Sequence, residues 1–296
     1  MTKHLMIAAM LLLNFSCIGY MIYKLTKQPT VLVSAMDYCK LSISGILAFI
    51  SDAVGLGSFA INIALAELLG TFHDEELPAM NNGAQVIPGL LESLFFMQII
   101  DVEMTTLVTL VIGACVGGVL GGSLITHLSK QAIRLAMMFC FTLIIGLLIS
   151  EKLDLLPASG VLTALHSWKL LFGFLGMVLC GMLTSVGIGL FVLVQTLLFV
   201  LNVSPLIAFP IMTTAGAMQQ PLTTFVFLQQ DKIPLKKTLI LSLSGCLGVL
   251  FVVLIFKHIT ITWLHTLLLF IVAFNLYKIS SAYFRTRSSI DLYASC

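Results

Sequence analysis

Two copies of a Gly-containing motif interrupt the apolar segments of this chain. Val54-Gly55-Leu56-Gly57 recurs as Val186-Gly187-Ile188-Gly189, 132 positions later (187 − 55). A second pair follows in the same order, because Gly83-Ala84-x-x-x-Pro88 recurs as Gly216-Ala217-x-x-x-Pro221. Gly is common in membrane helices, but two motifs in one order at nearly one offset indicate an internal duplication. Duplicated halves with interrupted apolar segments are typical of secondary transporters.

Charged side chains are too rare in this sequence to cover the surface of a soluble protein. Of 296 residues, 59% are hydrophobic and 9% are charged, whereas a soluble domain carries about 25% charged residues. We therefore predict an all-α polytopic membrane protein that contacts the lipid bilayer. The net charge of +2 gives no reason to expect a nucleic-acid partner.

The apolar runs predict four parts of the chain. The run Leu5–Tyr23 is long enough to cross a bilayer, so residues 1–30 are interpreted as an extra, uncleaved N-terminal transmembrane helix. Residues 40–150 form repeat A, residues 168–282 form repeat B, and residues 283–296 form a cytoplasmic tail.

The Gly motif divides the first apolar segment of each repeat. The pieces Leu41–Val54 and Ser58–Leu69 have roughly 12–14 residues, too few for a hydrocarbon core about 30 Å thick at 1.5 Å per residue. A discontinuous helix that crosses once and a re-entrant helical hairpin both fit these lengths. We favour hairpins, which leave three crossings per half and therefore predict inverted repeats.

The Lys and Arg residues give an orientation. Either topology places most of them, together with the C-terminus, on the cytoplasmic side and the N-terminus outside. The rule does not choose between the two topologies. We predict a multi-pass protein of the bacterial plasma (inner) membrane.

Two carboxylic acids lie within apolar segments, where a charge is costly and needs a cause. Asp52 lies just before Gly55, and Glu92 lies in the middle of a segment that contains Pro88. Both are candidates for proton coupling, and Asp52 is also a candidate for substrate binding. The alternatives are that Asp52 caps or pairs at the helix break, and that a Lys elsewhere neutralises Glu92.

Uncharged polar side chains gather in corresponding segments of both repeats. Some are expected to join packed helices, and others to line a polar cavity near the midplane. Helix N-termini after Gly57 and Gly189 would present free N–H groups and a positive dipole end, which suits a reversibly bound anion. The predicted substrate-binding residues are Asp52, Gly55, Gly57, Ser58, Asn81, Asn82, Gln85, Thr184, Ser185, Gly187, Gly189, Thr213 and Thr214.

Other patterns predict packing rather than chemistry. Gly113, Gly117 and Gly121 recur at every fourth position, a spacing that lets membrane helices approach closely. The seven Cys and six His residues form no metal-ligand or disulfide pattern, so no metal or cofactor is predicted. Gly57-Ser58-Phe59 lacks the Gly-x-Ser-Gly arrangement of an intramembrane serine protease, so no enzyme activity is predicted.

The segments Asp52–Ser58 and Thr184–Leu190 resemble the Gly-rich segments of the TauE/SafE sulfite exporter family, also called TSUP or DUF81 permeases. Ala79–Asn82 and Thr213-Thr214 are similar to the family's Ala-rich segment, and the resemblance covers both halves. Where the family continues to three glycines and a Pro, this chain has bulkier residues, which makes it a divergent member.

The resemblance implies a permease for small anions such as sulfite, sulfonates, sulfoacetate or related organic acids. It implies alternating access around a midplane site at the helix breaks. The alternative is a membrane scaffold or assembly protein that transports nothing. The sequence leaves open the substrate, the direction of transport, coupling to protons and association into a homodimer.

Overall fold

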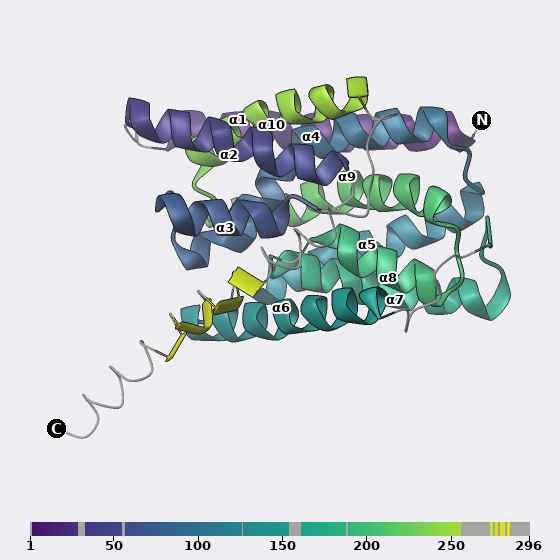
Figure 1. The fold of residues 1–296 in the computed structure, drawn as a ribbon. Coiled ribbons are helices and arrows are strands. Elements are labelled where there is room, and N and C mark those ends of the chain that lie inside the picture. The colour runs from purple at the N-terminus through teal and green to yellow at the C-terminus, as the bar shows by residue number, and fades with distance from the viewer. Residues whose placement is uncertain are drawn as a thin grey trace.

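The protein is a bundle of α-helices (Figure 1). The computed structural model describes residues 2–28, 33–54, 57–125, 127–153, 161–187 and 189–255, with several positions between 273 and 284. The all-α prediction is confirmed for these residues, which form no β-strand beyond one isolated bridge between Leu162 and Val203. The elements are α1 (Thr2–Lys27), α2 (Ala35–Ala53), α3 (Phe59–Leu69), η1 (Asp74–Glu76), α4 (Leu77–Ile99), α5 (Met104–Ile125), α6 (Lys130–Lys152), α7 (Ser167–Ser185), α8 (Leu190–Val200), α9 (Pro205–Gln229) and α10 (Leu235–Ile255).

The Gly motifs separate a long helix from a short one in each half. α2 and α7 have 19 residues each, and α3 and α8 have 11 residues each. α2 is longer than the predicted piece Leu41–Val54, but it is not among the described helices that are long and apolar enough to span a membrane. Ser34 caps α2 by accepting the N–H of Asp37, which adds polar turns before the apolar run. The end of predicted repeat B, residues 256–282, lies mostly outside the described residues.

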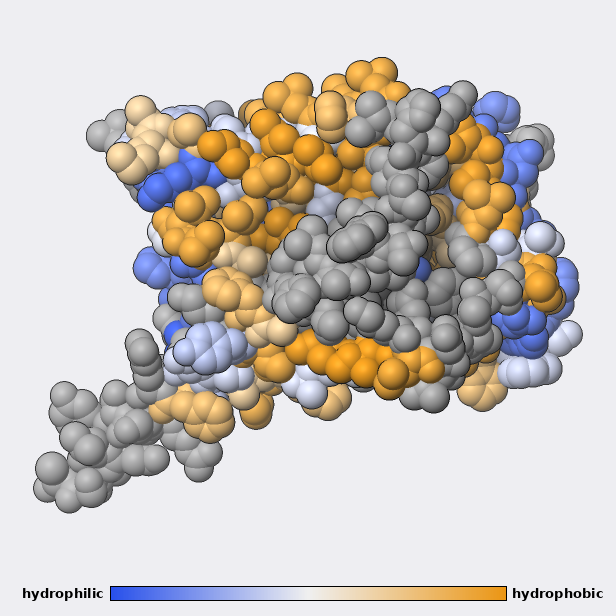
Figure 2. All heavy atoms as spheres, in the orientation of Figure 1, coloured by the Kyte–Doolittle hydropathy of each residue, from blue (hydrophilic) through white to orange (hydrophobic). Residues whose placement is uncertain are grey.

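The outer surface of the bundle is apolar over most of its length. Among the described helices, α1, α5, α7 and α10 are each long and apolar enough to span a membrane. In α7 the exposed side chains include Leu171, Leu175 and Leu179, which recur along one face. Figure 2 shows apolar residues across the middle of one face, with hydrophilic residues toward both ends. Such a continuous apolar surface fits contact with lipid rather than with water.

Close glycine contacts join two pairs of parallel helices. In α5, a Cβ at Gly113 would lie 2.7 Å from the carbonyl oxygen of Phe174 in α7, and one at Gly121 would lie 2.6 Å from Cα of Met182. In α10, a Cβ at Gly248 would lie 2.5 Å from the carbonyl oxygen of Ile46 in α2. The prediction that the glycines of α5 serve packing is therefore confirmed.

α4 and α9 form the centre of the bundle and run antiparallel. The rings of Phe96 and Phe209 lie 5.3 Å apart, and the hydroxyl oxygens of Ser93 and Thr214 lie 3.1 Å apart. α4 also packs against α10, and α9 packs against α5. α1 covers this centre, because Asn14 Nδ2 donates a 2.8 Å hydrogen bond to the carbonyl of Ala217.

Replacing Gly117 by Ala tests the glycine contacts. The added Cβ would overlap the backbone carbonyl of Val178, so we expect the detergent-solubilised protein to lose about 1–3 kcal/mol of stability. The control is Gly146→Ala in α6, where nothing lies within 4 Å of the added atom and helix propensity improves by about 1 kcal/mol. Thermal unfolding measures both variants. Equal melting temperatures would show that the close contact does not hold α5 against α7.

A second prediction concerns the start of α5. The Glu103 carboxylate accepts the N–H groups of Thr105 and Thr106, at 3.1 and 2.6 Å. Burial tends to raise the pKa of Glu103, but hydrogen bonds from Thr106 and Thr105 outweigh it and lower the pKa from 4.5 to about 2. Its stabilisation is therefore complete above pH 4.5 and is lost as the pH falls towards 2. We expect Glu103→Gln to cost about 0.5–2 kcal/mol at neutral pH. The difference from wild type, followed by thermal unfolding, should shrink in acid.

Candidate functional site

The short helix α3 turns back to the end of the bundle where α2 begins. Lys40, in the second turn of α2, donates from Nζ to the carbonyl of Leu69 at the end of α3, at 3.3 Å. Lys237 donates to the carbonyl of Thr71 at 2.6 Å, and Arg134 Nε donates to Asp74 Oδ2 at 2.6 Å. The loop after α3 therefore lies beside the starts of α6 and α10.

The short helix α8 turns back in the same way at the other end of the bundle. The N–H of Leu162, before α7, donates to the carbonyl of Asn202, after α8, at 2.9 Å. The N–H of Ser204 returns a 2.9 Å bond to the carbonyl of Leu162. Thr106, at the start of α5, accepts from the N–H of Leu165 at 2.9 Å. Because α5 runs from this end to the start of α6, the two short helices enter from opposite ends.

The two Gly motifs meet inside the bundle. A Cβ at Gly57 would lie 3.7 Å from Cβ of Phe191, and a Cβ at Gly189 would lie 3.7 Å from Cβ of Phe59. Gly57 has φ +84° and Gly187 has φ +111°, left-handed values that side chains rarely adopt. The structure thus brings the N-termini of α3 and α8 together, while Gly55 lies outside the described residues.

Asp52 is the centre of a buried hydrogen-bonded cluster beside Gly57. Its Oδ1 accepts the N–H of Ser58 at 2.6 Å, and its Oδ2 accepts the amide Nε2 of Gln85. The Ser58 hydroxyl donates to Oε1 of Gln85 at 2.6 Å, which fixes the amide with its nitrogen towards Asp52. Asp52 therefore accepts the N–H of Ser58, the residue just before α3, which agrees with the alternative that Asp52 pairs at the helix break.

Three further buried polar side chains lie on the faces of α3 and α4 that carry this cluster. Asn81 and Glu92 lie on the same face of α4 as Gln85, and Asn62 lies one turn after Ser58 in α3. All three are at most 1% exposed. Among the described residues, neither amide atom of Asn62 or Asn81 has a partner, and the Glu92 carboxyl has only the Asp52 carboxyl within hydrogen-bonding reach. Burying a polar group without a hydrogen-bond partner costs folding free energy, so the polar residues at this site need a reason other than stability.

Glu92 faces Asp52 closely enough for the two carboxyl groups to interact electrostatically. The structure places no Lys or Arg against Glu92 among the described residues. The alternative that a Lys neutralises it is therefore wrong for that part of the chain. Asp52 in α2 and Glu92 in α4 therefore place two acidic groups on neighbouring helices at this centre.

The predicted hydroxyl residues Thr184, Ser185 and Thr213 of repeat B bond to helix carbonyls instead of joining this cluster. The Thr184 hydroxyl donates to the carbonyl of Cys180 at 2.8 Å, and the Ser185 hydroxyl donates to the carbonyl of Gly118 at 2.9 Å. Thr213 donates back to the carbonyl of Phe209 at 3.0 Å. Asn82 of repeat A also joins helices, because its amide donates to the carbonyl of Thr184 at 3.3 Å.

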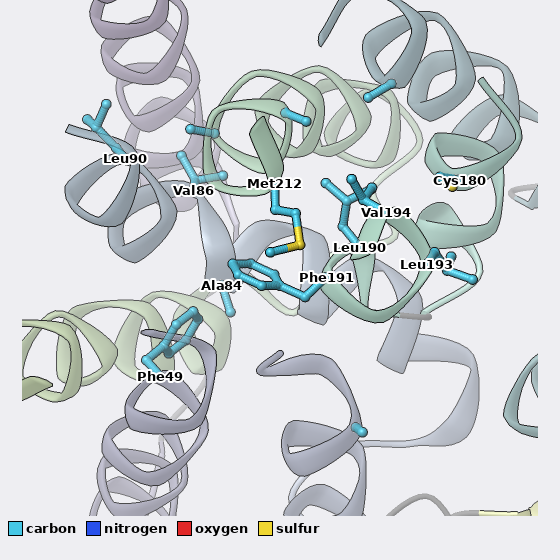
Figure 3. Packing of buried hydrophobic residues seen from close by; sticks show 14 of the residues in the cluster. Phe49, Ala84, Val86, Leu90, Cys180, Leu190, Phe191, Leu193, Val194 and Met212 are labelled. Atoms are coloured by element: carbon cyan, nitrogen blue, oxygen red, sulfur yellow. The ribbon is translucent and has the colours of Figure 1, made fainter. Parts of the chain in front are cut away.

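The tip of α8 is apolar where the tip of α3 is polar. Leu190 occupies the position that corresponds to Ser58, and both Leu190 and Phe191 are buried. Figure 3 shows Phe191 beside Met212 of α9 and Ala84 of α4. The centre is therefore polar on the side of repeat A and apolar on the side of repeat B.

Two contributors were not among the predicted binding residues. Asn62 lies four positions after Ser58, and Ser93, on α4 next to Glu92, meets Thr214 of α9. Helical spacing from Ser58 could have selected Asn62. Ser93 gave no signal, because a Ser in an apolar helix commonly bonds within its own helix.

A cavity of about 420 Å³ opens at the end of the bundle that carries Asp74 and Arg134. Its lining includes Glu75, Glu76, Pro78, Ala79, Asp231 and Lys232. Pro78, one of the lining residues, has its Cα 3.8 Å from the position of a Cβ built on Gly187.

No family model, curated protein or solved structure matches this chain. The resemblance to the sulfite exporter family stays a prediction made from the residues.

The left-handed backbone at Gly57 gives a direct prediction. Gly57→Ala should destabilise the protein by about 1–2 kcal/mol, because a Cβ is disfavoured at this φ. Gly189→Ala is the matched control. Its added atom meets Phe59 Cβ at an ordinary 3.7 Å, and its φ lies outside the left-handed range. Thermal unfolding in detergent should give a clearly lower melting temperature for Gly57→Ala, and a reversed order would contradict the role of Gly57.

Proposed function

We propose that this chain is a secondary transporter for small anions in the bacterial inner membrane. The observation that carries the proposal is the reciprocal contact of Gly57 with Phe191 and of Gly189 with Phe59. It joins the tips of two short helices that enter from opposite ends. Paired broken helices whose N-termini meet inside a membrane protein are a recurring way to build a transport site.

The direction of the helices supports inverted repeats. α2 corresponds to α7, α4 to α9, and α5 to α10, since each pair has similar length and offset. α4 and α9 run antiparallel, as the pairs Phe96–Phe209 and Ser93–Thr214 require. α2 packs in parallel against α10, and α7 packs in parallel against α5. Each helix therefore runs opposite to its counterpart in the other repeat.

Re-entrant hairpins fit the contacts of both short helices. α3 ends beside Lys40 of α2, and α8 ends beside Leu162, which precedes α7. An 11-residue helix rises about 16 Å, only half of a hydrocarbon core about 30 Å thick. The hairpin tips therefore lie near the midplane, and alternating access moves one repeat against the other around them.

The N-termini of α3 and α8 favour an anion over a cation as substrate. Free N–H groups and the positive dipole end stabilise a negative group without a full positive charge. Together with the sequence resemblance, this favours sulfite, sulfonates, sulfoacetate or a related organic acid. The cavity of about 420 Å³ at the Arg134 end is the entrance that this conformation leaves open.

Counterflow in proteoliposomes tests the proposal. Purified protein should exchange labelled sulfite, methanesulfonate, isethionate, sulfoacetate or lactate faster than protein-free liposomes do. Gly57→Val and Gly189→Val should abolish this exchange, because a branched side chain at either tip obstructs the opposite Phe. Gly146→Val, which has open space around it, is the control. No exchange of any panel member would reject the transporter and leave the scaffold alternative.

Cysteine labelling tests the hairpins. In a Cys-free background, the variants His73→Cys and Ser204→Cys should react with an impermeant maleimide from opposite sides of the membrane. His73 should share its side with a Cys at Gln230, which lies in the loop between α9 and α10. Labelling of His73 and Ser204 from the same side would reject two hairpins of opposite entry.

A further inference from the structure

We infer that the Asp52 carboxylate competes with the transported anion for the same hydrogen-bond donors, and that protonation of Asp52 releases these donors to the anion. The inference rests on the proposed function and adds to it the way in which anion and proton are coupled. It concerns the donors around Asp52, which are the Ser58 N–H and the Gln85 amide.

Asp52 lies where an anion would bind and accepts hydrogen bonds from the donors that an anion would use. Its two oxygens take the Ser58 N–H at the start of α3 and the Nε2 donor of Gln85. Because the Ser58 hydroxyl donates to Gln85 Oε1 at 2.6 Å, the amide is held with its nitrogen available to a negative group. A carboxylate, a sulfonate and a sulfite present the same kind of oxygen to these donors. One position therefore serves either Asp52 or a free anion.

The surroundings contain no buried cation that would hold a second negative charge. Asp52 faces Ser58 from α3, and Gln85 and Glu92 from α4. From α10, Cys246 lies within electrostatic range of Glu92, and α8 contributes Phe191. Among the described residues, the only buried Lys, Arg or His is Arg134, which pairs with Asp74 at the end of the bundle. An anion that enters beside an ionised Asp52 is repelled without compensation.

Other buried polar groups of the same site supply hydrogen-bond donors for an anion and a second carboxyl group for proton exchange. The Glu92 carboxyl faces the Asp52 carboxyl within hydrogen-bonding reach and has no other partner in the described part of the chain. The amides of Asn62 and Asn81, on the faces that carry Ser58 and Gln85, are buried and unpartnered among the described residues. Glu92 can exchange a proton with Asp52, and the two amides can donate to the anion. These groups point to a ligand independently of the helix N-terminus.

The coupling step is a proton transfer with balanced charge. A proton from the aqueous phase bonds to a carboxylate oxygen of Asp52 and neutralises it. The Ser58 N–H and the Gln85 Nε2 then donate their hydrogen bonds to the entering anion. On the opposite side the anion leaves, Asp52 releases the proton, and the carboxylate returns to the N-terminus of α3. One proton moves with one monovalent anion in the same direction, so net charge does not cross the membrane.

Asp52→Asn separates binding from coupling, because Asn keeps the shape of a protonated Asp and cannot release a proton. The probe is the panel member with the fastest wild-type counterflow, preferably methanesulfonate or isethionate, whose strong acids do not permeate undissociated. We expect wild type to accumulate it about tenfold per unit of imposed pH difference. Asp52→Asn should show no pH-driven accumulation, and its counterflow should no longer depend on pH, whereas that of wild type should fall as the pH rises.

The matched control is Asp101→Asn, because Asp101 is exposed and pairs with Lys3 at the end of the bundle. It should accumulate the probe as wild type does. pH-driven accumulation by Asp52→Asn would overturn the inference. So would loss of counterflow by a variant that melts like wild type, because Asp52 would then be a ligand and not a competitor.

A measurement on wild type alone decides the question if Asp52→Asn does not fold. An inward gradient of methanesulfonate or isethionate should acidify liposomes that contain a pH-sensitive dye, relative to protein-free liposomes. Counterflow without acidification, or accumulation driven by a sodium gradient at constant pH, would overturn the inference while leaving the transporter intact. Absence of wild-type counterflow would instead reject the proposed function.

Discussion

A helix that begins inside a membrane protein must find acceptors for N–H groups that water cannot reach. α3 begins at such a place, where the carboxylate of Asp52 accepts a hydrogen bond from the N–H of Ser58. This one requirement brings α2, α3 and α4 together, because Gln85 completes the same cluster. It also places a carboxylate where the positive end of a helix dipole favours one. The pairing role at the helix break and the proposed transport role are therefore two uses of one geometry.

The two repeats have the same framework and different centres. The glycine contacts of α2 with α10 and of α5 with α7 are equivalent, as are the contacts of Gly57 and Gly189 with Phe191 and Phe59. The chemistry is not equivalent. Repeat A contributes Asp52, whereas repeat B has Thr184 at the corresponding position, with its hydroxyl bonded to its own helix. In the proposed transporter, both halves move, and the polar half alone binds the anion and couples it to the proton.

The glycine contacts also explain how so polar a centre is enclosed. With close backbone approach at Gly113, Gly121 and Gly248, the outer helices press against the core without large side chains between them. Their exposed faces carry Leu and Phe instead. Membrane helices gain little from apolar burial against each other, so close van der Waals packing and internal hydrogen bonds must stabilise the bundle. The buried polar residues of α4 and α9 supply the second of these.

The sequence located the helix breaks well, because Gly at a left-handed φ has few substitutes. Helix boundaries within the apolar segments were also close, as for α3, which ends at Leu69 as expected. The length of α2 was wrong, since a capping Ser34 and polar first turn extend a helix beyond its apolar run. Thr184 and Ser185 were predicted in the site because spacing cannot tell a hydroxyl that faces a cavity from one that bonds a neighbouring carbonyl.

By itself, the sequence determined an all-α chain with a lipid-facing composition, two matching Gly breaks and two acids in apolar segments. These follow from local rules of hydropathy, helix length and glycine conformation. Only the tertiary structure decided that Asp52, Ser58, Gln85 and Glu92 share one centre, and that repeat B meets it with Leu190 and Phe191. Which side chains meet depends on the rotation and direction of packed helices, and these are set by contacts between residues far apart in the chain.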